Sequence, residues 1–141
     1  MILWDIASQK RIRTFAGHER GLACIEFQGD IIVSGANDAM IKVWSAVTGE
    51  CLQTLSGHDM LVRALAFDPP SGRLVSASYD MTIKVWDLNK GKLVRDFKDV
   101  HNCHIFDVKF DQSRIIRYVL FCDGLESREL MWFAVHRAPT R

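Results

Sequence analysis

The chain has 141 residues, of which 48% are hydrophobic and 25% are charged, as is usual for a soluble globular domain. This composition argues against intrinsic disorder and low-complexity sequence. Eighteen Lys and Arg residues against 17 Asp and Glu residues leave a formal net charge of +1. We therefore expect no broad electrostatic binding to nucleic acid or to a membrane surface, and no apolar run approaches the roughly 18 residues that span a bilayer.

The cysteines and the first residues bear on the cellular compartment. The four cysteines are Cys24, Cys51, Cys103 and Cys122, and no two of them have the C-x-x-C spacing. The first residues do not show the basic region and apolar stretch of a signal peptide. We expect an intracellular chain with reduced cysteines, in the cytoplasm, the nucleus or both.

Two segments of the sequence repeat each other closely. Residues 32–44 and 74–86 align without a gap, and seven of the thirteen positions are identical. Gly17 and His18 match Gly57 and His58, and a Phe follows nine residues after each His. A third copy starts at His101 and reaches Phe110 nine residues later. A recurrence in register at a period near 40 residues indicates a repeat architecture.

Each repeat predicts the same succession of short strands. Residues 23–27 and 63–67 alternate as half-buried strands do, and 31–35 and 74–77 are short apolar strands before an Asn-Asp or Tyr-Asp turn. Residues 41–44 and 83–86 are β-branched, and turns lead into final strands at 51–55 and 93–97. No stretch within 1–116 has a convincing helical period.

The Gly-His opening, the Trp-Asp close at Trp4 and Trp86, and the period near 40 resemble the WD40 repeat. The resemblance implies an all-β fold, a partial β-propeller with about two complete four-stranded antiparallel blades. The expected divisions are a partial blade at 1–16, repeats at 17–56 and 57–100, and a partial blade at 101–116. Residues 117–141 form a divergent tail.

Four polar residue types recur in the two complete repeats, and their Ser-to-Asp and Asp-to-Trp offsets, four and six residues, are the same in both. They are His18, Ser34, Asp38 and Trp44, and then His58, Ser76, Asp80 and Trp86. A catalytic triad is one interpretation, but a catalytic site does not usually repeat in every structural unit. In WD40 repeats such a set is a buried hydrogen-bond network, so we expect structural tetrads and no enzyme.

No cofactor and no metal site is expected. The sequence contains no Gly-rich phosphate loop, paired-carboxylate motif or nucleophile elbow. His101 and His104 flank Cys103, but no second ligand pair stands at zinc spacing.

The stretches 17–24, 32–35 and 57–63 look like the C-terminal blades of F-box/WD-repeat proteins of the β-TrCP-like branch, substrate receptors of SCF ubiquitin ligases. That resemblance implies binding of a protein partner or a (phospho)peptide on the top face of the propeller. The positions carried over are Arg20, Gly21, Ala23, Asn37, Leu61, Arg63, Tyr79, His104 and Phe106. Arg63 is the best phosphate contact, because a planar guanidinium binds phosphate oxygens in pairs. His104 stands where this branch would carry Arg.

A second interpretation is a generic WD40 scaffold fragment from signalling or RNA processing. No segment of the chain resembles an F-box. We expect a fragment of a propeller, with open blade edges that favour self-association.

The tail departs from the repeat pattern after Ile116. Arg117 stands where the repeat expects Ser, Phe121 where it expects Asp, and Ser127 where it expects Trp. Residues 126–136 carry apolar side chains partly on one side, which predicts a short helix. The alternative is that the apolar stretch 130–135 covers an exposed sheet edge or drives aggregation.

Overall fold

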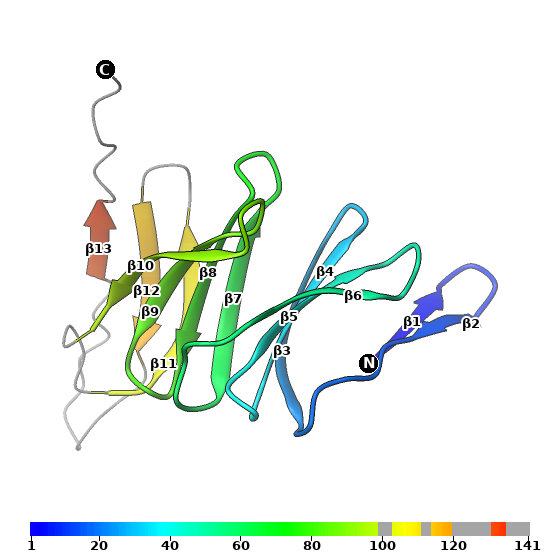
Figure 1. Cartoon of the computed structure of the whole chain (residues 1–141), viewed down its shortest axis with the longest axis horizontal. Coiled ribbons are helices and arrows are strands. Elements are labelled where there is room, and N and C mark those ends of the chain that lie inside the picture. Colours follow the sequence, from blue (N-terminus) through cyan, green and yellow to red (C-terminus); the bar gives the residue numbers. More distant parts are fainter. Residues whose placement is uncertain (99–102, 111–113, 120–130, 135–141) are drawn as a thin grey trace.

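The computed structural model describes residues 1–98, 103–110, 114–119 and 131–134, and within these ranges it contains strands and no helix (Figure 1). A two-stranded sheet pairs β1 (Ile2–Asp5) with β2 (Lys10–Thr14). A four-stranded sheet, here blade 1, follows in the order β3 (Leu22–Gln28), β4 (Ile31–Ala36), β5 (Ile41–Ser45) and β6 (Cys51–Leu55).

Blade 2 repeats this order with β7 (Val62–Asp68), β8 (Arg73–Ser78), β9 (Ile83–Asp87) and β10 (Lys92–Phe97). Blade 3 contains β11 (Ile105–Phe110), β12 (Arg114–Val119) and β13 (Met131–Ala134). All neighbouring strands are antiparallel, and the blades stand one beside the next (Figure 1). The expected all-β partial propeller is confirmed.

The repeats share one register, which explains why their side chains pack alike. Ile32 pairs with Trp44 in blade 1, and Leu74 pairs with Trp86 in blade 2. The first strand of each complete blade shifts register just after its start, between Leu22 and Cys24 and between Val62 and Ala64. Identical pairing follows from the repeated sequence, because register sets which side chains share a face.

The hydrophobic core lies between the blades. Strand β7 alternates, so that Leu65 packs on Val33 and Val43 of blade 1, whereas Ala66 packs on Val108 of blade 3. Both faces of blade 2 are therefore covered by its neighbours. A Cβ atom added at Gly35 would lie 2.7 Å from Val62 Cγ1, which shows how closely blades 1 and 2 approach.

Blade 3 corrects the expectation for the tail. Strand β12 runs to Val119, past Ile116, and β13 pairs with it over residues 131–134, so the predicted helix at 126–136 is wrong over 131–134. The remainder of that predicted helix lies outside the described residues, as do Phe121 and Ser127. Phe110 pairs with Ile115 as Phe67 pairs with Leu74, which places Arg117 at the serine position of the repeat.

The cysteines correct a second expectation. Cys24 and Cys51 are free thiols, whereas Cys103 is disulfide-bonded. The prediction of reduced cysteines therefore holds for Cys24 and Cys51 and is wrong for Cys103.

The structure joins each polar tetrad into a hydrogen-bonded chain. In blade 2, the His58 Nδ1 atom lies 2.8 Å from Asp80 Oδ2, and His58 Nε2 lies 2.8 Å from Ser76 Oγ. The Trp86 indole N–H donates to the same Ser76 oxygen at 2.8 Å. With a neutral imidazole, the Nδ1–H group donates to the carboxylate and the Ser76 hydroxyl donates to Nε2.

Blade 1 has the same geometry. His18 Nδ1 lies 2.8 Å from Asp38 Oδ2, and His18 Nε2 and Trp44 Nε1 each lie 2.8 Å from Ser34 Oγ. Both networks tie the loop before the first strand to the turn between the second and third strands. Because Ser34 and Ser76 are fully buried, losing one member would leave desolvated polar atoms without a partner.

Hydrogen bonds also shift the acidity of the two turn aspartates. Burial alone would raise the pKa of Asp80, but hydrogen bonds from His58, Thr82 and the Asp59 backbone outweigh it and hold the pKa well below its usual value. The pKa of Asp38 is lowered in the same way, with burial opposed by His18 and two backbone N–H groups.

We predict that Asp80→Ala destabilises the protein by about 1–3 kcal/mol, because it leaves the buried His58 and its partners without an acceptor. The urea midpoint measured by fluorescence should fall. Asp30→Ala, an exposed aspartate in the β3–β4 turn, is the control and should leave the midpoint nearly unchanged. An unchanged midpoint for Asp80→Ala would contradict a stabilising network.

We predict that the protein loses stability in acid through these carboxylates. A depressed folded-state pKa contributes stability that is present above the unfolded value of about 3.9 and is lost as the pH falls toward the folded value. The urea midpoint should therefore begin to drop below about pH 5 and keep falling below about pH 3, and Asp80→Asn should flatten this dependence. An equal slope in the variant would show that other groups cause the acid sensitivity.

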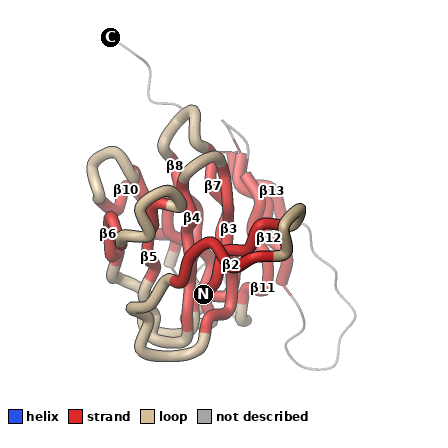
Figure 2. Tube along the Cα trace, turned by 90° about the vertical axis from the view of Figure 1, so that its right-hand side faces the viewer, coloured by secondary structure: helices blue, strands red, loops and turns tan. Residues whose placement is uncertain are grey.

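One face of blade 1 is uncovered. Leu22, Ile25 and Phe27 are 45%, 53% and 54% exposed, whereas the equivalent Val62 and Leu65 in blade 2 are 0% and 3% exposed. Figure 2 views the molecule from this side, with the small β1–β2 sheet in front. Strands β1 and β2 bring Met1 and Leu3 against Trp44 but leave this apolar patch in solvent.

We predict that the isolated chain self-associates or aggregates through this face, because contiguous exposed apolar patches drive association. Light scattering should report species larger than a monomer. The double variant Ile25→Lys with Phe27→Lys should shift the distribution toward the monomer, while a monodisperse wild-type monomer would contradict the prediction.

Candidate partner-binding groove

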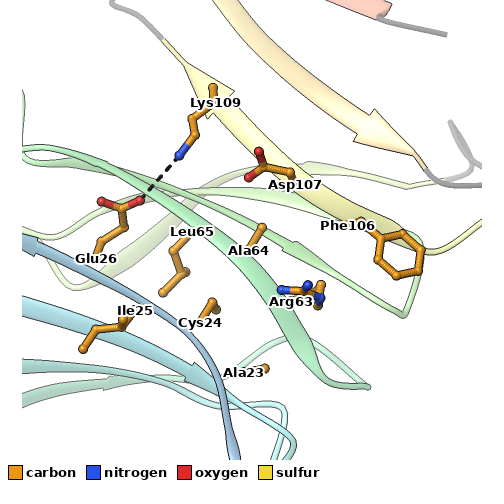
Figure 3. Close-up of a pocket in the computed structure, with 10 residues that line it drawn as sticks. All are labelled: Ala23, Cys24, Ile25, Glu26, Arg63, Ala64, Leu65, Phe106, Asp107 and Lys109. Carbon is orange, nitrogen blue, oxygen red and sulfur yellow. Dashed lines mark ion pairs between the residues drawn. The ribbon is translucent and has the colours of Figure 1, made fainter. Parts of the chain in front are cut away.

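The first strands of the three blades build a groove. Strand β7 lies between β3 and β11, and together they enclose a hollow of about 510 Å³ (Figure 3). The residues that line it are Ala23, Cys24, Ile25, Glu26, Arg63, Ala64, Leu65, Phe106, Asp107 and Lys109. Ala23, Arg63 and Phe106 occupy the same repeat position, five residues after the repeat histidine, so repetition itself brings them together.

Arg63 is a cation in this groove without a counter-ion. Its guanidinium carbon lies 6.0 Å from the centre of the Phe106 ring, within range of a cation–π contact. Within the described ranges, the side chain forms no ion pair, in contrast to Lys84, which binds Asp96 at 2.6 Å. The donors of Arg63 therefore remain available to an anionic ligand.

Three rings extend the groove at the end where the first strands begin, which is the top face. The Tyr79 ring lies 4.6 Å from the His104 ring and 5.4 Å from the Phe106 ring, centre to centre. The His104 Nδ1–H group donates to the Tyr79 carbonyl oxygen at 2.7 Å, and the Tyr79 N–H donates to the Leu61 carbonyl at 3.0 Å. These bonds fix the aromatic cluster beside Arg63.

The remaining predicted contact residues lie elsewhere. Arg20 and Gly21 line a separate hollow of about 320 Å³ beside Phe15 and Trp44. Asn37 is exposed, and its N–H donates to the Gly21 carbonyl at 2.9 Å. The structure thus brings together Ala23, Arg63, Tyr79, His104 and Phe106, with Leu61 attached through the backbone, and leaves Arg20, Gly21 and Asn37 apart.

Sequence reasoning missed three charged residues of the groove. Lys109 Nζ lies 3.8 Å from Glu26 Oε1, so an ion pair links blade 3 to blade 1 past β7 (Figure 3). Asp107 stands between Phe106 and Lys109 on β11. Glu26 and Lys109 each stand eight residues after the histidine of their repeat, and they carry opposite charges. An alignment of the repeats could therefore have indicated the ion pair.

The tetrad serines and the Cys24 thiol are poorly placed to act as nucleophiles. Ser34 and Ser76 are fully buried, so a substrate in solvent cannot reach their hydroxyl groups. Burial raises the pKa of the Cys24 thiol to about 12, which keeps it protonated and unreactive near neutral pH. Within the described part of the chain, no three His, Cys, Asp or Glu side chains gather as metal ligands. None of its elements is a helix long and apolar enough to cross a membrane.

The sequence is similar to those of known proteins. The chain is 33% identical over 124 residues to Pre-mRNA-processing factor 17 of Saccharomyces cerevisiae, an alignment that covers 78% of this chain and 27% of that protein. It is 36% identical over 107 residues to Cell division control protein 4 of the same yeast, covering 75% of this chain and 14% of that protein. The chain thus spans about a quarter or less of these relatives.

The fold also matches a solved structure. The crystal structure of the computationally designed Ika4 protein superposes with a TM-score of 0.82 at 32% identity, and it covers 96% of this chain and 79% of that one. The family model described as "WD domain, G-beta repeat" matches residues 9–45 and 49–87, more than half of the chain. The chain therefore belongs to the WD40 repeat family.

Proposed function

We propose that this WD40 module captures an acidic or phosphorylated segment of a protein partner in the groove at its top face. The observation that carries the proposal is the Arg63 guanidinium, which faces the groove beside Phe106 without a counter-anion among the described residues. A phosphate carries close to two negative charges and three acceptor oxygens, which suit a guanidinium. The rings of Tyr79 and Phe106 add apolar contact area.

The cellular role that we propose is substrate recognition for an SCF-type ubiquitin ligase, in the cytoplasm or the nucleus. Two observations support it: the resemblance of stretches 17–24 and 57–63 to F-box/WD-repeat receptors, and the 36% identity to Cell division control protein 4. The alternative role is a scaffold in RNA processing, which the 33% identity to Pre-mRNA-processing factor 17 favours. Affinity purification from cells would separate the roles through the partners that the repeats capture: ubiquitin-conjugated proteins for the first role, or splicing factors for the second.

We predict that Arg63→Ala weakens binding of a phosphoserine peptide by about 10- to 150-fold, the equivalent of 1.5–3 kcal/mol for a hydrogen bond to a charged group. Fluorescence anisotropy with the full chain measures the dissociation constant, and the same peptide without the phosphate should bind weakly to both proteins. The thermal transition should not move, because Arg63 forms no hydrogen bond or ion pair with any of the residues that the structure describes.

Arg73→Ala is the matched control. Arg73 is an exposed arginine at the start of β8, at the opposite end of blade 2 from the groove. This variant should bind the phosphopeptide like the wild type. Equal binding by wild type and Arg63→Ala would overturn the assignment of the groove.

A further inference from the structure

The groove also contains an anion without a counter-ion. Asp107 is exposed on β11, its Oδ1 atom accepts the Val108 backbone N–H at 2.9 Å, and its carboxylate forms no ion pair within the described residues. Figure 3 shows it on the same strand as Phe106, the ring under the Arg63 guanidinium. The groove therefore offers one unpaired cation and one unpaired anion.

Arg63 and Asp107 lie at successive residue positions along the groove. Arg63 shares its repeat position with Phe106, and Asp107 is the next residue along β11. A strand rises about 3.3 Å per residue, so an extended ligand would meet the two positions with adjacent or nearly adjacent residues. Arg63 and Asp107 form no ion pair with one another, so neither charge is neutralised by the other.

The next two charged side chains along the groove neutralise each other. Glu26 and Lys109 stand three residues beyond Arg63 and Phe106 in their repeats, and they bind each other at 3.8 Å. A basic side chain of a ligand that entered from the top face would therefore find its free anionic partner in Asp107 rather than in Glu26.

We infer that the groove selects an extended segment with charges of both signs: an acidic or phosphorylated side chain for Arg63 and, one or two residues away, a Lys or Arg side chain for Asp107. This inference rests on the proposed function and specifies its ligand. Asp107 repels a segment that places a second negative charge where the Lys or Arg side chain would lie, so it contributes specificity by disfavouring the wrong partner as well as by attracting the right one. Asp107 is a specificity residue in this account, and Arg63 is the principal contact.

Three phosphoserine peptides of equal length test the inference with the full chain. They differ only two residues after the phosphoserine, where they carry lysine, alanine or glutamate. Asp107→Asn should weaken binding of the lysine peptide by about three- to fivefold, the scale of a partly exposed ion pair. It should leave the alanine peptide unchanged and strengthen binding of the glutamate peptide. Asp30→Asn, which removes an exposed carboxylate in the β3–β4 turn away from the top face, should change none of the three.

The outcomes separate this inference from the function on which it rests. If Asp107→Asn changes the affinity of all three peptides equally or of none, while Arg63→Ala weakens all three, the inference is overturned and the proposed function stands. If Arg63→Ala changes no affinity, the proposed function fails, and the inference fails with it. Circular dichroism of each variant, with an unchanged spectrum and thermal transition, assigns the effects to the groove rather than to folding.

Discussion

The hydrogen bonds to the turn aspartates fix the top-face turns of the two complete blades. Asp80 accepts from His58, from Thr82 and from the Asp59 backbone, and so it fixes the turn that directly follows Tyr79. Met81 in that turn has a φ of 66°, a left-handed conformation that is costly for a side chain with a Cβ atom. The bonds to Asp80 hold this conformation, and through it they orient the Tyr79 ring toward His104 and Phe106.

Blade 3 carries different residue types at two of the tetrad positions. Its register places Arg117 and Phe133 at the positions that hold Ser76 and Trp86 in blade 2. What holds β11 in place is apolar packing, with Ile105 and Val108 fully buried against blade 2. The groove thus combines two strands whose blades are fixed by polar networks with one strand, β11, that is held on blade 2 mainly by apolar packing.

The sequence predicted the repeated elements because their signals are local. The Ser, Asp and Trp residues of the tetrads recur at fixed offsets, and each predicted strand within the two repeats has a counterpart with similar bounds. Strand β13 was not predicted, because a short apolar run such as Leu130–Val135 does not distinguish helix from strand, and its pairing with β12 is a long-range contact. Asp107 was missed for a related reason: its importance depends on three strands from different repeats lying side by side.

The ion pair between Glu26 and Lys109 has a consequence for how the blades unfold. Arrays of repeats usually behave as chains of units in which each unit is coupled only to its neighbours. This pair joins the first and third blades directly, which adds a second-neighbour coupling across blade 2. Because the Lys109 side chain is 64% exposed, that coupling is weak. Blade 3 is therefore held mainly by its apolar packing on blade 2, and opening of that contact would take Phe106, Asp107 and Lys109 out of the groove.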